Sequence, residues 1–146
     1  MSVGRICVRE VDIGEPDENV QTAAMRMHAR KVGSLVVVNK SREPVGIVTD
    51  RDLTVRVLAQ GRDPIATTLF EIMTPRPKIV REGASIEESL RVMRAGVFRR
   101  VPVVDPSGKL TGLVTLDDIL DLLSEEFREI RGVLEQESPR TFACGS

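Results

Sequence analysis

The sequence of 146 residues contains no tryptophan or tyrosine, only four phenylalanines, two cysteines and a single histidine. Aromatic rings are the usual platforms for stacked bases, and a net charge of −1 gives no field to hold a polyanion, so nucleic acid is not an expected partner. Purely apolar runs, such as Leu35 to Val38, are far shorter than the roughly 20 residues of a membrane helix. We therefore expect no membrane-spanning segment.

The scarce reactive residues also limit the chemistry. Cys7 and Cys144 stand alone near the two ends, which favours free thiols over a disulfide or half a zinc site. The first ten residues carry three charges and no apolar stretch of signal-peptide length, which favours a cytoplasmic protein. His28 falls at the polar edge of an expected helix with Val20, Ala24 and Met27 on its inner face, which favours a solvated residue over a catalytic base. An enzyme would therefore have to use carboxylates, arginines and hydroxyls.

The chain contains an internal duplication. Shifting it by 66 residues aligns Ile6 to Leu53 with Ile72 to Ile119 without a gap, and eleven of the 48 aligned pairs are identical. Composition alone would give roughly three identities in such an alignment. The sequence therefore predicts two copies of one unit of about 60 residues.

Each copy has the pattern helix, strand, strand, helix, preceded by a short extended piece. Asn19 and Ser85 are the candidate N-caps of the first helices. β-Branched runs, polar turns and helical spacing then predict the following elements in the two copies: extended pieces at 11–13 and 78–80, helices at 20–31 and 86–95, strands at 35–39, 45–49, 101–105 and 110–115, and second helices at 50–60 and from 116 onward. The segment 61–73 is the expected linker.

One such copy is too small to hide its own apolar surface, and two copies packed sheet to sheet would bury it. We predict a mixed α/β (α+β) fold in which each repeat has a small β-sheet with two helices, and the repeats pair about a pseudo-twofold axis. The expected boundaries are 1–66 for the first repeat with the start of the linker, 67–124 for the second repeat, and 125–146 for an extended C-terminal helix with a loose tail.

Both second strands end in a shared motif, Gly46-Ile47-Val48-Thr49-Asp50-Arg51-Asp52 and Gly112-Leu113-Val114-Thr115-Leu116-Asp117-Asp118. This motif, together with the segment from Phe98 to Asp105 and that from Asp50 to Leu53, resembles the CBS domain, named for cystathionine β-synthase. The resemblance covers about residues 6 to 124 and is to a stand-alone CBS pair, or Bateman module. It implies that adenine nucleotides bind between the repeats, usually AMP, ADP or ATP and sometimes S-adenosylmethionine or NAD.

The resemblance also implies that each site combines the Thr and Asp of one repeat with residues of the other. The first site would comprise Thr49, Asp52, Thr74, Ile79, Arg99, Arg100, Val101 and Pro102. The second would comprise Val8, Ile13, Gly33, Ser34, Leu35, Thr115 and Asp118. The second departs from the fuller pattern because it has no counterpart of the two arginines, so we expect it to bind a ligand with less phosphate charge or none.

The residue types in the motif suit a nucleotide. An Asp carboxylate can accept hydrogen bonds from both ribose hydroxyls, a helix N-terminus offers free N–H groups, and paired arginines present charged donors to phosphate. The alternatives are that Thr49, Asp52, Thr115 and Asp118 only cap helices, and that the arginines form a solvated face.

The last helix extends beyond its counterpart in the first repeat. A heptad pattern of apolar residues runs along it, made by Leu116, Leu120, Leu123, Phe127, Ile130 and Leu134 and widened by Ile119, Leu122 and Val133. We expect the part beyond Ser124 to pack on a second copy in a homodimer.

Three functions are compatible with these observations. The first is a regulatory nucleotide-binding module that requires no cofactor, has no catalytic activity and acts on an unidentified protein. The second is a constitutive dimeric scaffold with vestigial clefts. The third is a small nucleotide enzyme using Asp50, Asp52, Asp117 and Asp118, for which the sequence shows neither a base nor a metal partner.

Overall fold

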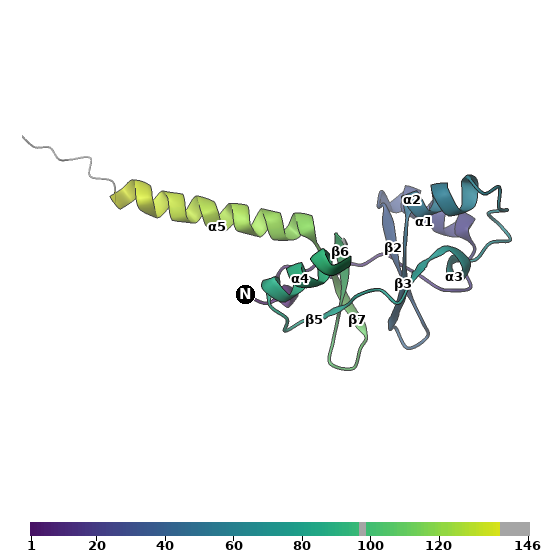
Figure 1. Cartoon of the computed structure of the whole chain (residues 1–146), viewed down its shortest axis with the longest axis horizontal. Coiled ribbons are helices and arrows are strands. Elements are labelled where there is room, and N and C mark those ends of the chain that lie inside the picture. Colours follow the sequence, from purple (N-terminus) through teal and green to yellow (C-terminus); the bar gives the residue numbers. More distant parts are fainter. Residues whose placement is uncertain (97–98, 138–146) are drawn as a thin grey trace, which may run out of the picture.

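The computed structural model describes residues 1–96 and 99–137 (Figure 1). Phe98 of the motif, the thiol of Cys144 and the predicted tail from Ser138 lie outside the described residues. No helix within the described ranges is both long enough and apolar enough to cross a membrane. The two sheets lie side by side in the middle of the molecule, and α5 (Leu116–Glu137) runs away from both of them.

The first repeat contains β1 (Ile13–Gly14), α1 (Val20–Arg30), β2 (Ser34–Val38) and β3 (Pro44–Thr49). Helix α1 begins after Asn19 because the Asn19 side chain accepts a hydrogen bond from the Thr22 N–H at 2.8 Å. It ends at Lys31, which adopts a left-handed conformation with φ of 56°. The inner face of α1 is Val20, Ala23 and Met27, so the expectation for Ala24 was wrong by one position, while His28 is exposed as predicted.

The predicted second helix of the first repeat is not a continuous α-helix. It consists of α2 (Asp50–Asp52) followed by a π-helix (Leu53–Leu58), in which the Ala59 N–H bonds to the Thr54 carbonyl at 2.9 Å. Such a wide turn adds a residue per turn and often occurs at functional sites.

The second repeat contains β5 (Val80–Arg81), α4 (Ile86–Gly96), β6 (Arg100–Val104), β7 (Leu110–Thr115) and α5. The Ser85 hydroxyl accepts a hydrogen bond from the Glu88 N–H at 3.1 Å and so caps α4 as predicted. Helix α5 follows β7 without a loop, as expected for the second helix of a repeat.

The predicted linker is partly ordered secondary structure. It contains α3 (Leu69–Ile72), whose first and last residues are buried in the core of the first repeat, and it leads into β4 (Thr74–Pro75). Sequence reasoning missed both elements because each has four residues or fewer. The linker thus helps to complete the first repeat.

The described strands form two sheets. One has the order β1-β2-β3-β4 and the other the order β5-β6-β7, with the first pair in each sheet parallel and the others antiparallel. Each sheet covers a core of its own, one centred on Leu35, Val37 and Val48 and the other on Val101, Val103 and Val114. The mixed α/β fold of two small sheets with a C-terminal helix is therefore as predicted.

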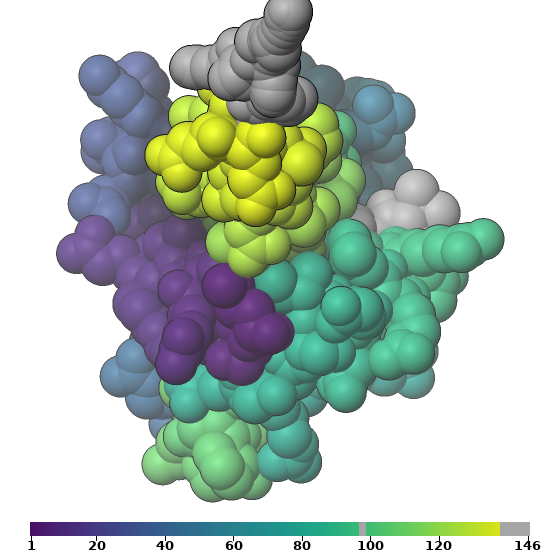
Figure 2. Space-filling model, turned by 90° about the vertical axis from the view of Figure 1, so that its left-hand side faces the viewer, coloured from purple at the N-terminus to yellow at the C-terminus, as the bar shows by residue number. Residues whose placement is uncertain are grey.

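The two repeats exchange the segments that precede them. Val8 bridges to Leu113 of the second sheet, and Thr74 pairs with Ile47 of the first sheet. The two pairings are equivalent, because adding 66 to Val8 gives Thr74 and adding 66 to Ile47 gives Leu113. The N-terminal 3₁₀ turn (Val3–Arg5) continues this contact, because the Val3 N–H bonds to the Ala84 carbonyl at 2.8 Å. In Figure 2 these N-terminal residues, in purple, lie against the teal second repeat below α5. This reciprocal exchange establishes the pseudo-twofold relation between the halves.

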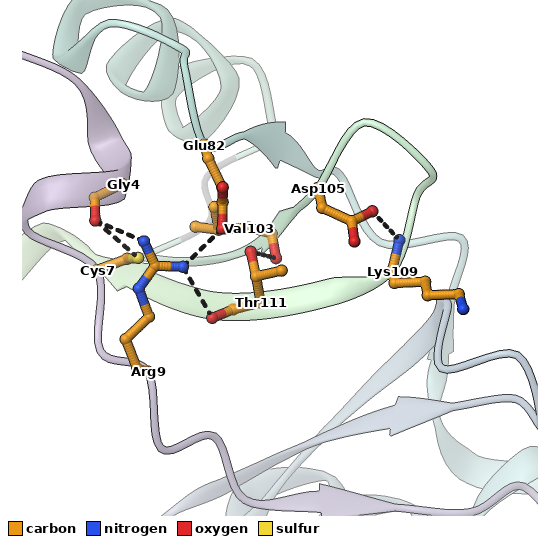
Figure 3. A network of polar contacts seen from close by, with 8 residues as sticks. All are labelled: Gly4, Cys7, Arg9, Glu82, Val103, Asp105, Lys109 and Thr111. Atoms are coloured by element: carbon orange, nitrogen blue, oxygen red, sulfur yellow. Dashed lines mark hydrogen bonds and ion pairs between the residues drawn. The ribbon is translucent and has the colours of Figure 1, made fainter.

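Arg9 fastens the exchanged N-terminal segment to the second repeat (Figure 3). Its guanidinium donates to the Glu82 carboxylate at 2.7 Å, to the Thr111 carbonyl at 3.2 Å and to the Gly4 carbonyl at 2.8 Å. The hydrogen bond from Arg9 lowers the pKa of Glu82 below its ordinary value of 4.5. Cys7 belongs to the same segment, and its burial against the core of the second repeat raises the pKa of its free thiol.

Candidate functional site

Thr49 and Asp52 form a reciprocal hydrogen-bonded cap at the start of α2. The Asp52 N–H donates to Thr49 Oγ1 at 3.2 Å, and the Thr49 N–H donates to Asp52 Oδ2 at 2.8 Å. The expected capping role of these residues therefore exists. Because the cap uses Oδ2, the other carboxylate oxygen, Oδ1, can still face a ligand.

The equivalent pair in the second repeat has the same geometry. The Asp118 N–H donates to Thr115 Oγ1 at 3.1 Å, and the Thr115 N–H donates to Asp118 Oδ2 at 3.3 Å. An equivalent backbone hydrogen bond lies beside each cap. The Asp50 N–H donates to the Gly33 carbonyl at 3.0 Å, and the Leu116 N–H donates to the Arg99 carbonyl at 2.8 Å. Duplication has thus preserved the backbone of both sites.

A cavity of about 270 Å³ opens beside Thr49 and Asp52. Ligand pockets in proteins usually start at about 300 Å³, so the volume is at the small end of that range. We call this cavity the first cleft, and it is lined by Ile47, Thr49, Asp52, Thr74, Pro77, Lys78, Arg99 and Arg100. It draws on β3 and α2 of the first repeat, on β4 and the residues after it, and on the start of β6.

Five of the eight residues expected in the first site line this cleft: Thr49, Asp52, Thr74, Arg99 and Arg100. The other three do not. Val101 and Pro102 are buried in β6, so only their backbone could face a ligand, and Ile79 is 45% exposed outside the lining. The cleft adds Ile47, Pro77 and Lys78, which sequence reasoning missed.

Lys78 gives the first cleft a third cation beside Arg99 and Arg100. Arg99 makes one ion pair, with Asp117 at 3.3 Å, and both of these side chains are largely exposed to solvent. An exposed pair of this kind contributes little stability, so phosphate oxygens could displace Asp117 at small cost. The 66-residue shift aligns Lys78 with Asp12, so the two repeats carry opposite charges at this position.

Asp52 has a further neighbour in the first repeat. Arg56 Nε lies 3.8 Å from Asp52 Oδ1, and Arg56 Nη1 donates to the Ile72 carbonyl at 2.8 Å. The position equivalent to Arg56 in the second repeat is Leu122, which has no hydrogen-bond donor. The two aspartates therefore differ in their electrostatic surroundings although their caps are alike.

The residues expected in the second site have a different setting. Val8 lies beside Leu113, Ser34 lies opposite Thr49 in the first sheet, and the Leu35 side chain is fully buried in the first core. Ile13 lies in β1 beside Val36. Where the first cleft has Lys78, this side of the molecule has Asp12, which pairs with Arg30 at 2.8 Å. The difference in charge between the two sides therefore exceeds the two missing arginines.

A larger and shallower depression, of about 810 Å³, lies along β1 and α1. Its arginines are already paired, Arg26 with Glu18 and Arg30 with Asp12. Within residues 1–96 and 99–137, no three His, Cys, Asp or Glu side chains gather as a metal site. We assign no ligand to this depression.

The model of the CBS domain family matches residues 3–59 and 69–125. The chain belongs to the CBS domain family. It contains a pair of CBS domains, as its sequence predicted, and the matched ranges together take in every residue that lines the first cleft.

Two relatives illustrate how widely such CBS pairs occur. An uncharacterized protein of Bacillus subtilis, YlbB, is 42% identical over 116 residues, which are 79% of this chain and 76% of that protein. The uncharacterized protein MK0525 of Methanopyrus kandleri is 38% identical over 122 residues, 84% of this chain. The aligned part is 62% of MK0525, so this chain spans less than two thirds of that relative.

Two solved structures to which this chain is similar carry bound groups. Hypoxic Response Protein I, solved with two coordinated zinc ions, has a TM-score of 0.76 and 32% identity, covering 83% of this chain and 98% of that one. A protein of this name from Mycobacterium tuberculosis is 35% identical over 125 residues, 86% of this chain and 82% of its own length. CBSX2 of Arabidopsis thaliana, solved in complex with AMP, has a TM-score of 0.73 and 26% identity, and the match covers 85% of this chain and 96% of that one.

Proposed function

We propose that this CBS pair is a regulatory module that binds an adenine nucleotide in the first cleft and has no catalytic activity of its own. One observation carries the proposal, namely that the Asp52 carboxylate and the cations Lys78, Arg99 and Arg100 line one cavity between the repeats. A nucleotide has the matching chemistry, with a diol that donates at one end and phosphates that accept at the other. The AMP bound to the CBS pair of CBSX2 supports the choice of ligand class.

Each part of the cleft has a role in this proposal. Asp52 Oδ1 accepts hydrogen bonds from the ribose hydroxyls, while Oδ2 remains in the cap with Thr49. Ile47 and Pro77 provide apolar contact for the base, and Arg99 and Arg100 provide charged donors for phosphate. The second residue set, with Asp12 in place of Lys78, binds a nucleotide more weakly or not at all.

The proposal excludes catalysis for a physical reason. Asp52 and Asp118 are engaged in helix caps, Asp117 pairs with Arg99, and the Asp50 carboxylate accepts the Arg51 N–H at 2.8 Å. A carboxylate used in this way binds and orients a ligand and is a poor general base. We propose that ligand binding instead favours one arrangement of a cytoplasmic homodimer, which a regulated protein then senses.

The test is a thermal-shift panel of the intact protein with AMP, ADP, ATP, NAD and S-adenosylmethionine, followed by calorimetry of each ligand that acts. A ligand that binds only the native state raises the melting temperature in step with RT ln(1 + [L]/Kd). We expect one or more adenine nucleotides to raise the melting temperature at millimolar concentration, and guanosine monophosphate to do so less. No response from any adenine ligand would favour the scaffold with vestigial clefts.

A further inference from the structure

Helix α5 has two apolar faces, and residues 1–96 and 99–137, the part of the chain that the structure describes, cover only one of them. Ile119 is buried, and Leu116 and Leu122 pack against the core of the second repeat. By contrast, Phe127 is 63% exposed and Ile130 is 57% exposed. Figure 1 shows the helix leaving the body with no other described segment beside its outer turns. A contiguous apolar stripe of this kind is typical of a protein–protein contact.

The stripe has the spacing of a helix-pairing surface. Leu120, Leu123, Phe127 and Ile130 are exposed and follow one another at intervals of three, four and three residues, and we call these four residues the α5 seam. Such a seam matches another helix with the same period, because both then wind around each other with the seams in contact. A second copy of this chain carries the identical seam, so a twofold pair satisfies both helices at once.

The charges beside the seam favour one orientation of that pair. With Leu123 and Ile130 as d positions, Glu126 is a g position and Arg131 is the following e position. Arg131 lies 3.6 Å from Glu135 on its own helix, in an exposed pair that contributes little stability. In a parallel pair in register, Glu126 of each copy also faces Arg131 of the other, which gives two further attractive contacts. An antiparallel pair that places Leu123 opposite Phe127 would instead bring Glu126 close to Glu126 of the other copy, and the two carboxylates would repel each other.

The opposite face of α5 is suited to water. Glu125, Glu129 and Gly132 lie on this face, and nothing lies within 4 Å of a side-chain carbon built at Gly132. Between Ser124 and Arg131 the helix is therefore amphipathic, and its apolar residues Phe127 and Ile130 are exposed among the described residues. Isolated helical segments of this length are marginal in water, so the outer turns of α5 gain stability from a partner helix.

We propose that α5 pairs in parallel with α5 of a second copy and that this contact is the main interface of the homodimer. The proposal builds on the dimer named in the proposed function and is independent of nucleotide binding. It assigns the seam to one occupant, the same helix of another copy.

Light scattering on the full chain tests the contact. The wild type should have twice the chain mass of 16.1 kDa at micromolar concentration, and Phe127→Ser/Ile130→Ser should have the mass of one chain. The matched control is Glu125→Ser/Glu129→Ser, which changes the solvent face of the same turns and should leave the dimer intact. A monomeric wild type, or a seam variant that keeps the double mass, would overturn the proposal.

Crosslinking tests the orientation. The background chain carries Cys7→Ala and Cys144→Ser, and Ile130→Cys places one cysteine at a d position. Residue 130 of one copy lies beside residue 130 of the other only in a parallel pair, so this variant should form a disulfide-linked dimer under mild oxidation. Glu129→Cys on the solvent face is the control and should remain unlinked. Without a crosslink at residue 130, parallel pairing is wrong.

Calorimetry separates this proposal from the proposed function. The seam variant should bind AMP with the stoichiometry per chain of the wild type, because the seam lies outside the first cleft. If wild type and variants all fail to bind nucleotide, the proposed function fails while the mass measurements still decide the dimer.

Discussion

Arg56 lies one helical turn beyond Asp52, with its Nε 3.8 Å from Asp52 Oδ1. The same guanidinium donates to the carbonyl of Ile72, two residues before Thr74 of the first cleft. Arg56 therefore connects the aspartate on one side of the cleft with the segment that forms its other side. We infer that it is a positioning residue, because it does not itself line the cavity.

The first prediction is that Arg56→Leu, which copies Leu122 of the second repeat, weakens AMP binding by ~3-fold to 10-fold, the size expected from one partly exposed charged contact. Calorimetry gives the affinity. Arg51→Leu removes an exposed arginine from the same turn and should bind AMP like the wild type. Equal losses in both variants would show that bulk charge, and not the position of Asp52, governs the affinity.

Sequence periodicity predicted most of this fold because the same order of helices and strands is visible in both repeats, so the pattern in one repeat supports the interpretation of the other. The caps at Asn19 and Ser85, the strands and the start of α5 are set by neighbours in the chain, and the structure confirms them. The π-helix was missed because it differs from an α-helix by one residue per turn, which an apolar pattern of six residues does not reveal.

The exchange of segments was not predictable in the same way. Val8 and Leu113 are far apart in the chain, and a single bridge leaves no periodic signal for either residue. The same reason explains why Lys78 was missed in the first cleft, since its position depends on β4 pairing with β3. Sequence reasoning expected Thr49, Asp52, Arg99 and Arg100 at one site because their types and spacing match a family motif, and all four line the first cleft.

The second prediction concerns the close approach that the exchange requires. A side-chain carbon built at Gly112 would lie 2.7 Å from Cys7 Sγ and 3.0 Å from the Val8 carbonyl oxygen. Gly112→Ala should therefore lower the free energy of unfolding by ~1–3 kcal/mol, the usual cost of overpacking. Gly132→Ala, in open space on α5, should instead raise it by up to ~1 kcal/mol. Urea denaturation measures both, and a neutral Gly112→Ala would contradict the tight contact.

The third prediction is a pH dependence set by Arg9 and Glu82. The bond from Arg9 lowers the pKa of Glu82, so the contribution of the pair is complete above the ordinary value of 4.5 and is lost as the pH falls through the lower folded value. Glu82→Gln should therefore lose less stability than the wild type between neutral pH and pH 3, measured as urea midpoints. Parallel curves for the two proteins would show that the ion pair adds nothing.

The fourth prediction tests the ribose contact. Asp52→Ala should weaken AMP binding by ~10-fold to 100-fold, because bonds to a charged acceptor are worth about 1.5–3 kcal/mol. Asp118→Ala removes the equivalent cap in the second repeat and is the matched control for lost capping, which costs ~1 kcal/mol of stability in either place. If both variants are destabilised alike and both bind AMP normally, Asp52 is only a helix cap.

The fifth prediction separates phosphate recognition from folding. Arg99 and Arg100 are exposed at the first cleft, so Arg99→Ala/Arg100→Ala should bind ATP and ADP far more weakly while adenosine binding changes little. Binding of ATP to the wild type should also weaken as salt rises from 0.05 M to about 0.5 M, because exposed charges are screened at the higher ionic strength. The control is Arg91→Ala/Arg94→Ala on exposed positions of α4, which removes the same charge elsewhere.

Calorimetry on these proteins distinguishes the outcomes. The wild type should show one dominant phosphate-sensitive site per chain, and the cleft variant only a weak site that salt does not affect, because the second residue set has Gly33 and Ser34 where the first has Arg99 and Arg100. Equal losses for adenosine and ATP would mean that the arginines support the fold rather than the ligand. Two equivalent ATP sites would mean that Asp12, paired with Arg30, does not repel phosphate, and the charge asymmetry between the repeats would then have no functional role.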